Sequence, residues 1–225
     1  MQVEVRSNFL SRVFKIAEAG GIENLALMFK KDVLEVRGIS TDSVVLIKAR
    51  LEYINKDEDE ERTVFVNVAN MRRFLRETFK MEIEDGRIIL KFENKTLSIR
   101  LIEEVEIKNL EWDNFLEVET NADELSNFLN TFNVGKYDDV ALLLKTDGEG
   151  KLYAEYSNEN ISGRMEISKI SEELEVAIDI TRLRNLLKPM SGGIVLGLKE
   201  NLPLKIVHEA MGDVLEIYLA PIIYE

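Results

Sequence analysis

The chain has 225 residues, of which 29 are basic and 42 acidic, so its net charge at pH 7 is −13. Its length suits one large domain or two of about 100 residues each, and its 45% of hydrophobic residues is enough for a packed core. Without cysteine the chain excludes disulfides and thiolate chemistry, and no apolar run reaches the roughly 18 residues that predict a membrane helix.

In chain order, the first half opens with a short alternating strand and a helix capped by Ser7. Four strands follow, because apolar runs alternate with turn residues. The last of them runs into a second helix, predicted over Val68–Phe79 from its apolar spacing. Strands rich in isoleucine, valine and leucine close the half. The four middle strands are predicted at Leu25–Lys30, Val33–Gly38, Val44–Leu51 and Thr63–Val66.

The second half repeats this order, with a helix at Ala122–Phe132 capped by Thr120 and another at Thr181–Met190. Antiparallel strands with two helices per half predict an α+β fold. The predicted division is an N-terminal domain at 1–102, a connector at 103–114 and a C-terminal domain at 115–225. The four middle strands of this half are predicted at Val140–Thr146, Leu152–Ser157, Ile161–Ser168 and Glu175–Ile178.

The two halves also match in sequence, which predicts a duplicated domain. Three pairs of segments recur in the same order, each offset by about 112 to 115 positions. Chance could supply one such pair, but three in register favour duplication. The pairs are Val3-Glu-Val-Arg-Ser-Asn8 with Leu116-Glu-Val-Glu-Thr-Asn121, Asn24-Leu-Ala-Leu-Met-Phe29 with Asp139-Val-Ala-Leu-Leu-Leu144, and Asn67-Val-Ala-Asn-Met-Arg-Arg-Phe-Leu-Arg76 with Asp179-Ile-Thr-Arg-Leu-Arg-Asn-Leu-Leu-Lys188.

Basic residues collect on three of the four predicted helices. In the helix predicted over Val68–Phe79, apolar residues form one stripe and basic residues fill the opposite arc. The helix predicted over Thr181–Met190 and the first helix of the chain divide in the same way. The residues predicted to face away from the sheet are Arg12, Lys15, Arg72, Arg73, Arg76, Lys80, Arg182, Arg184 and Lys188.

These basic faces point to phosphate contact although the chain as a whole is acidic. A single exposed helix with lysine and arginine indicates only a solvated surface. Matching positions in the two halves, Arg72 with Arg184 and Arg76 with Lys188, favour a shared role. No aromatic side chains lie between these charges, so contact with phosphates in any sequence is predicted rather than base stacking. The helix at Ala122–Phe132 departs from the pattern, because it exposes aspartate, serine and asparagine.

Two further segments resemble a known family. Gly38-Ile-Ser-Thr-Asp-Ser-Val-Val-Leu46 resembles the segment after the third strand of the archaeal and eukaryotic sliding clamp, proliferating cell nuclear antigen (PCNA). Glu200-Asn-Leu-Pro-Leu-Lys-Ile206 followed by Tyr218-Leu-Ala-Pro221 resembles the C-terminal strands of that family. The duplicated layout, the connector and the basic helices extend the resemblance over essentially the whole chain, which is similar to archaeal-type or viral members.

The resemblance implies a function in DNA replication and repair. It implies a DNA-clamp fold in which three subunits form a pseudo-sixfold ring, with the helices lining a hole through which double-stranded DNA passes without sequence preference. Such a processivity factor is not an enzyme and needs no cofactor. DNA polymerase, the clamp loader, flap endonuclease and ligase dock on it through short clamp-binding peptides. Ring closure pairs edge strands between subunits, here Thr96–Leu101 and Ile161–Ser168.

The resemblance also assigns a pocket for partner peptides. In clamps the segment after Leu-Ala-Pro lies beside the connector and forms part of this pocket, which would explain the apolar C-terminal tail. The tail could instead cap a sheet edge. Among the connector residues the sequence does not single out one. The predicted pocket residues are Ile39, Val44, Leu46, Ala220, Pro221 and Ile222, with Val105, Ile107 and Leu110 as the connector candidates.

Other functions fit the sequence less well. The single histidine, His208, has no cysteine or second histidine to share a metal with, and the acidic run at Asp57–Glu61 lacks the ligand spacing of a known metal loop. No phosphate-binding glycine loop or nucleophile elbow occurs. The alternatives are one subunit of a heterotrimeric or checkpoint-type clamp and, in another class, a duplicated β-rich interaction scaffold that does not encircle DNA; a small-molecule enzyme ranks below both.

Composition also predicts a location. The absence of cysteine fits a reducing interior, and the alternating opening Gln2–Arg6 is not the start of a signal peptide. An intracellular, cytoplasmic and nucleoid-associated protein is therefore expected. One histidine and one glutamine beside 32% charged residues form a thermophile-like bias.

Overall fold

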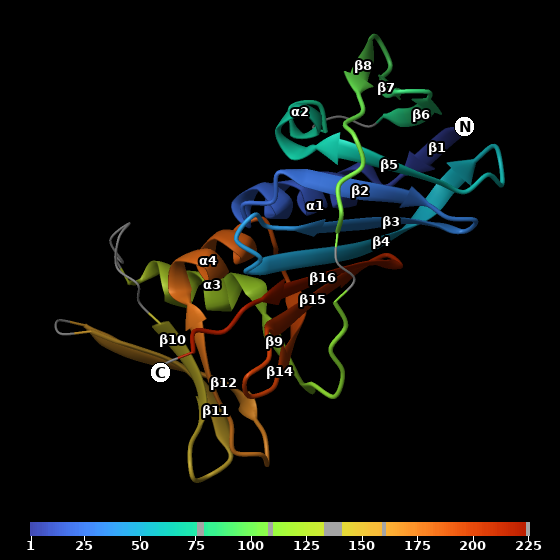
Figure 1. The fold of residues 1–225 in the computed structure, drawn as a ribbon. Coiled ribbons are helices and arrows are strands. Elements are labelled where there is room, and N and C mark those ends of the chain that lie inside the picture. Colours follow the sequence, from blue (N-terminus) through green and yellow to red (C-terminus); the bar gives the residue numbers. More distant parts are fainter. Residues whose placement is uncertain (76–78, 108–109, 133–140, 159–160, 224–225) are drawn as a thin grey trace. The chain divides into compact units, whose positions relative to one another are not determined.

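The computed structural model describes residues 1–75, 79–107, 110–132, 141–158 and 161–223 (Figure 1). The chain divides into two compact units. The first comprises Met1–Asn109 with Glu209–Glu216, and the second comprises Leu110–His208 with Ile217–Glu225. Each unit consists of antiparallel strands and two helices.

In the first unit one antiparallel run of strands supports both helices. The strands pair in the order β5-β2-β3-β4-β1-β6-β7-β8, so that β8 lies at an end. Helix α1 contacts both α2 and β4. The elements are β1 (Gln2–Val5), α1 (Ser7–Ala19), β2 (Asn24–Phe29), β3 (Val33–Ile39), β4 (Val45–Lys56), β5 (Arg62–Asn67), α2 (Val68–Arg72), β6 (Lys80–Glu84), β7 (Arg87–Lys91) and β8 (Thr96–Arg100).

The core of the first unit lies between α1 and the sheet. The apolar residues of α1 recur at helical spacing and are fully buried, as Val13 and Phe14 show. Side chains of the strands such as Leu27 and Leu34 are fully buried as well. Each such side chain contributes about 1.5–3 kcal/mol on burial. Gly38 of β3 is needed in this packing, because a Cβ there would lie 2.4 Å from the Leu25 side chain.

The second unit repeats the order of elements. Its strands form a four-stranded sheet, β12-β11-β10-β13, and a run β9-β14-β15. The leucines of α3 and α4 are buried, and the two helices contact each other. The elements are β9 (Leu116–Asn121), α3 (Ala122–Asn130), β10 (Ala141–Thr146), β11 (Lys151–Ser157), β12 (Ser162–Lys169), β13 (Glu175–Asp179), α4 (Ile180–Leu187), β14 (Gly193–Leu198), β15 (Leu204–Ala210) and β16 (Asp213–Leu219).

The element order confirms the predicted duplication. Both series run strand, helix, four strands, helix and three strands. The predicted α+β class and the antiparallel pairing are also confirmed.

The second helix is shorter than its apolar spacing predicts. The expected helix over Val68–Phe79 is wrong at residues 73–75 and at Phe79, because α2 ends at Arg72. Residues 76–78, including the predicted site residue Arg76, lie outside the described residues. Phe79 is buried by tertiary contacts instead, since its amide donates to Ser7 Oγ at 3.4 Å and its ring lies 5.8 Å from that of Phe92.

The predicted helix caps also differ. Ser7 is the first residue of α1, whose N-cap is Arg6, with no side-chain cap hydrogen bond. In the second unit Asn121, not Thr120, caps α3, because its Oδ1 accepts from the amides of Asp123 and Glu124 at 2.8 and 3.3 Å. Asparagine is among the residues that best satisfy the free amides of a first helical turn.

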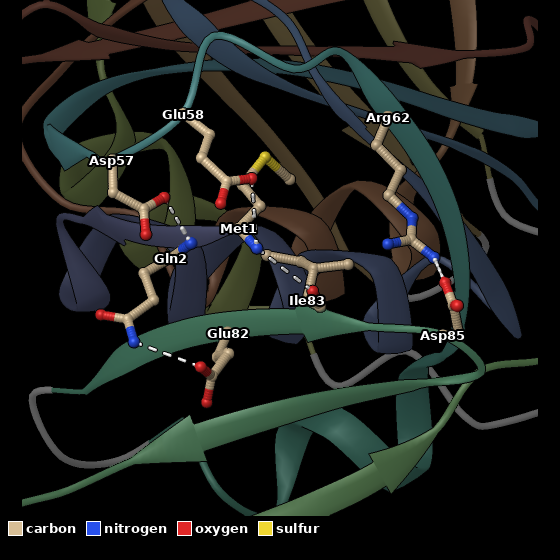
Figure 2. A network of polar contacts seen from close by, with 8 residues as sticks. All are labelled: Met1, Gln2, Asp57, Glu58, Arg62, Glu82, Ile83 and Asp85. Atoms are coloured by element: carbon tan, nitrogen blue, oxygen red, sulfur yellow. Dashed lines mark hydrogen bonds and ion pairs between the residues drawn. The ribbon is translucent and has the colours of Figure 1, made fainter.

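The acidic segment after β4 has a structural role that its composition did not predict. It holds the start of the chain: the Met1 amino group lies 3.6 Å from Glu58 Oε2 and 3.5 Å from the Ile83 carbonyl oxygen, to which it donates (Figure 2). The amide of Gln2 donates to Asp57 Oδ1 at 2.7 Å. The acidic segment therefore holds the first two residues of the chain beside the end of β4.

Candidate nucleic-acid and partner interfaces

The first unit brings predicted cationic residues together on two adjacent helices. Lys15 of α1 and Arg72 and Arg73 at the end of α2 are exposed, and Arg12 is half-buried. The Arg72 guanidinium forms an ion pair with Glu18 of α1, which ties the two helices together. This pair is exposed on both sides and is expected to add less than about 1 kcal/mol to stability. The helices therefore present a concentrated positive charge on an acidic protein.

Lys80 does not share the helix of the other cations. It is the first residue of β6, and its Nζ lies 3.4 Å from Glu4 Oε2 of β1. The expectation that Lys80 continues the helical arc is wrong, because the chain has left the helix at Arg72. The prediction that Lys80 contacts phosphates rests on its exposure and its charge.

In the second unit the cations lie on α4 and not on α3. Arg182 is half-buried, with its Nε 3.6 Å from Asp179 Oδ2, while Lys188 follows the helix and is exposed. Arg184 lies in the last turn, where the helix dipole favours positive charge. By contrast, the first turn of α3 exposes Asp123 and Glu124. Of the two helices of this unit, α4 carries basic residues and α3 acidic ones, so the prediction of phosphate contact applies to α4 alone.

A groove in the first unit unites three of the predicted pocket residues. It has a volume of about 260 Å³, with Ile39 on one side and Val105 and Ile107 of the connector on the other. The turn after β3 completes it. The remaining lining residues, which sequence reasoning missed, are Glu23, Asn24, Ser40, Thr41, Ser43 and Glu106.

The turn beside this groove is held by Ser40. Its hydroxyl donates to Asp42 Oδ1 at 2.6 Å and accepts from the amides of Val44 and Val45 at 3.1 and 2.9 Å. Ser43 takes a left-handed backbone with a φ of 60°. A serine-rich turn after a strand is the signal that could have identified these residues, because such side chains hydrogen-bond to their own turn.

The other predicted pocket residues are placed differently. Leu46 is 3% exposed and belongs to the core, and half-buried Val44 does not line the groove. The remaining four belong to the second unit, where the Ile222 amide donates to the Ala177 carbonyl at 2.8 Å. These four residues are Leu110, Ala220, Pro221 and Ile222.

Among the strands at the ends of the described sheets are β8 and β12. β8 ends the strand run of the first unit, and β12 ends the four-stranded sheet of the second. The open edge of such a strand has amides and carbonyls available for another chain. The apolar side chains Met165 and Ile167 of β12 and Leu97 of β8 are only half-buried. Both strands are those that the family resemblance assigns to ring closure.

No catalytic arrangement is visible in the described part of the chain. His208 is 4% exposed in β15, with its Nε2 3.3 Å from the Ser191 carbonyl oxygen. Within the described ranges no group of histidine, cysteine and acidic residues could hold a metal ion, and no helix there is long and apolar enough to span a membrane.

Comparisons with known proteins identify the fold. No protein-family model matches the chain, and no curated protein matches it in sequence. Many solved structures match it, including three that match nearly its whole length. The PCNA2–PCNA3 complex of Sulfolobus tokodaii has a TM-score of 0.79 at 18% identity, covering 98% of this chain and 99% of that one.

The other two structures are similar. A. fulgidus PCNA, solved with the C-terminal region of FEN-1 bound, has a TM-score of 0.86 at 17% identity, covering 100% of this chain and 99% of that one. PCNA of Entamoeba histolytica has a TM-score of 0.81 at 14% identity, covering 99% and 98%. The chain therefore has the fold of sliding clamps. More particularly, it has the DNA-clamp fold of PCNA, which confirms the resemblance at the level of fold.

Proposed function

We propose that this chain is a subunit of a DNA sliding clamp, a non-enzymatic processivity factor for DNA replication and repair. The observation that carries the proposal is the basic charge on α1, α2 and α4 of a clamp fold whose net charge is −13. Because an acidic exterior repels phosphates, DNA would be held only beside these helices. Contacts with phosphates alone carry no sequence information, so they permit sliding.

Three copies closing into a ring would use the open edges of β8 and β12. Pairing these strands between subunits would satisfy their free backbone groups and cover the half-buried Met165, Ile167 and Leu97. Head-to-tail contacts of this kind form closed rings when the rotation between copies closes. The ring is the part of the proposal that should be tested first.

Light scattering of the purified chain across a concentration series tests the ring. We expect a mass three times the 25.9 kDa of one chain. Met165→Lys places a charge at the β12 edge, so this variant should have the mass of a single chain. Met211→Lys makes the same change in an exposed turn outside both edge strands and should keep the larger mass.

A chain that stays monomeric at every concentration would contradict a homotrimer and favour a mixed ring. One observation points in that direction: α3 adds acidic residues where the other three helices add basic ones. Other subunits of a mixed ring could supply the missing charge.

We further propose that partner proteins dock in the groove formed by Ile39, Val105 and Ile107. DNA polymerase, the clamp loader, flap endonuclease and ligase are the partners that the clamp fold suggests. Ala220, Pro221 and Ile222 of the second unit are also proposed to contact partner peptides. A small groove with three apolar side chains and a hydrogen-bonded turn at its rim suits a short peptide with one or two apolar anchors.

Replacing the apolar side chains of the groove should weaken this docking. A labelled C-terminal region of FEN-1, which binds A. fulgidus PCNA, serves as the probe in fluorescence anisotropy. The double variant Ile39→Ser and Ile107→Ser is expected to weaken binding at least about tenfold, because both anchoring contacts are lost. Val44→Ser is the matched control, since Val44 is a half-buried apolar residue of the same loop that does not line the groove. Equal losses in both variants would contradict the assignment.

A further inference from the structure

The strands at the ends of the described sheets differ in what lies along their outer edges. Beside β5 the Ile102 amide donates to the Phe65 carbonyl oxygen at 3.0 Å. Beside β13 the Ile222 amide donates to the Ala177 carbonyl oxygen at 2.8 Å, and β9 contacts β12 without pairing with it. Among the described residues no segment pairs with the outer edge of β8 or of β12, so their backbone groups are available to another strand.

The duplication of the chain indicates which strands belong together. β4 and β12 are the fourth strands of the two series of elements, and β8 and β16 are the last. Within the chain β4 pairs with β16, whose start, up to Glu216, belongs to the first unit. The equivalent pair is β12 with β8, and the described part of the chain does not form it. A second copy of the chain is therefore the source of the missing strand.

Gly163 of β12 leaves room for an aromatic ring at the edge of the sheet. A Cβ at this position would lie 2.8 Å from Phe132 Cε1 and 3.6 Å from Phe128 Cε2, so the Phe132 ring occupies the space of the missing side chain. The two phenyl rings meet edge to face, with their centroids 5.0 Å apart. Glycine inside a strand weakens it and often marks the close approach of other groups. A side chain opposite Gly163 on a neighbouring strand would contact these rings directly.

Leu97 is the apolar residue of β8 that still has surface to cover. It is half-buried, whereas Ile99, which lies on the same face of the strand, is 6% exposed. Beside Gly163, Phe128 is likewise only half-buried. Leu97 placed opposite Gly163 would cover both apolar side chains. The same antiparallel register places Ile99 opposite Ile161, which is 46% exposed in the second unit.

The neighbouring registers are less favourable. Side chains alternate between the two faces of a strand, so only shifts by an even number of residues keep the apolar side chains on one face. A shift of four residues places Arg100 opposite Arg164, and like charges directly opposite each other are destabilising. A shift of two places Ile99, which its own unit already covers, opposite Gly163. A shift of two in the other direction places the charged Lys95 there.

We propose that β8 of a second copy pairs with β12 in the register that sets Leu97 opposite Gly163, with the leucine packed on Phe128 and Phe132. Gly163 determines this register, because any larger side chain at its position displaces the Phe132 ring on which Leu97 packs. The inference rests on the proposed ring and specifies the contact that closes it.

The chain has no cysteine, so cysteines introduced in pairs report the register. Directly opposite residues of antiparallel strands have Cα atoms about 4.5–5.5 Å apart, which a disulfide can bridge, whereas diagonal neighbours are about 7–8 Å apart. Ser98→Cys with Ser162→Cys tests the proposed register. Ser98→Cys with Arg164→Cys, or with Glu166→Cys, tests the shifts of two and four residues. After oxidation, non-reducing gels of the first pair are expected to show at least about tenfold more covalently joined chains than those of either other pair.

Gly163→Ala tests the role of the glycine itself. Its added Cβ displaces Phe132, so the association of chains, measured by light scattering on dilution, is expected to weaken about tenfold or more. Gly148→Ala is the matched control, because a Cβ at this exposed position of the same unit meets no atom within 4 Å beyond its chain neighbours. Melting curves identify a variant that fails to fold, and in that case the cysteine pairs still decide.

The outcomes separate this inference from the proposed ring. A wild-type mass of three chains, with Arg164→Cys or Glu166→Cys giving the most joined chains, would keep the ring and overturn the register. The same mass without joining in any pair would show that the ring closes through other strands. Equal association of Gly163→Ala and Gly148→Ala would overturn the role of Gly163. A wild type that stays monomeric would overturn this inference together with the homotrimer.

Discussion

Reversing the charge of Arg72 and Arg73 together, as Arg72→Glu and Arg73→Glu, is expected to weaken binding to duplex DNA at least about tenfold. Both side chains are exposed at the end of α2, and α2 contacts α1, the helix that carries Lys15 and Arg12. If they contact phosphates, each lost contact also removes about one unit from the slope of log affinity against log salt concentration. The measurement is a titration of a labelled duplex by the chain at several salt concentrations.

The control is a reversal of equal size on the other face of the sheet. Arg50 is exposed in β4 and alternates with the buried Ala49 and Leu51, so it points away from the core that α1 covers. Arg50→Glu with Arg87→Glu, at the turn between β6 and β7, gives the same charge change and should leave the slope unchanged. Equal losses would mean that only net charge matters, and the β-rich scaffold that never encircles DNA would then be the better description.

The ion pair between Arg72 and Glu18 bears on how DNA would be held. A phosphate that approaches Arg72 competes with a carboxylate already beside the guanidinium. The net gain of each contact is therefore small, which suits a protein that must release one phosphate to reach the next. Glu18→Gln should consequently raise DNA affinity, in the opposite direction to the arginine reversals.

Much of the fold could be predicted because alternation and turn residues determine it locally. The expected strand Glu175–Ile178 is observed at Glu175–Asp179, and Leu152–Ser157 at Lys151–Ser157. The end of the helix predicted over Val68–Phe79 could not be located from the local sequence. Phe79 stands at helical spacing from Met71 and Leu75, but its burial comes from Ser7 and Phe92, which are distant in sequence.

The same distinction between local patterns and distant contacts applies to the candidate sites. Charge on a helix face is a local pattern, so Arg72, Arg73 and Arg184 could be nominated from the sequence. Leu46 was nominated by family resemblance, but only packing shows that it is buried. Nothing local marks the pairing of Arg6 with Asp213, which are 207 positions apart. An aspartate after Met-Gly reads simply as a turn residue.

This pairing predicts the largest effect on stability. Asp213 is fully buried, and its Oδ1 accepts from Arg6 Nη1 and from the Glu52 amide, each at 2.9 Å. Its Oδ2 has no hydrogen-bond partner among the described residues. Among the described residues, Arg6 is the only one that forms an ion pair with Asp213, and Arg6→Gln removes its positive charge. We expect a loss of about 3 kcal/mol in the free energy of unfolding at pH 7, at the lower end for a broken buried pair because Arg6 is one-third exposed.

The loss of stability caused by Arg6→Gln should become smaller as pH falls. Burial raises the pKa of Asp213 despite the opposing hydrogen bond from Glu52 and the charge of Arg6. The folded state thus takes up this proton more readily than the unfolded state, and the contribution of Asp213 to stability falls as pH rises through the folded pKa. Without Arg6 the pKa should rise further. The difference between wild type and Arg6→Gln should therefore shrink as pH falls toward about 4, the ordinary value for aspartate.

Asp213→Asn provides the matched control, because it keeps the shape and the acceptor for the Glu52 amide but removes the charge. In that background Arg6→Gln should cost less than about 1 kcal/mol, and the cost should not change with pH. The free energy of unfolding of the wild type, the two single variants and the double variant is then measured with denaturant between pH 4 and 8. These four values form a double-mutant cycle. A penalty for Arg6→Gln that is the same in both backgrounds would show that Arg6 acts by packing its side-chain stem against the start of α1. A penalty that disappears with the carboxylate would show that the buried charge needs the guanidinium to join the β15–β16 turn to β1.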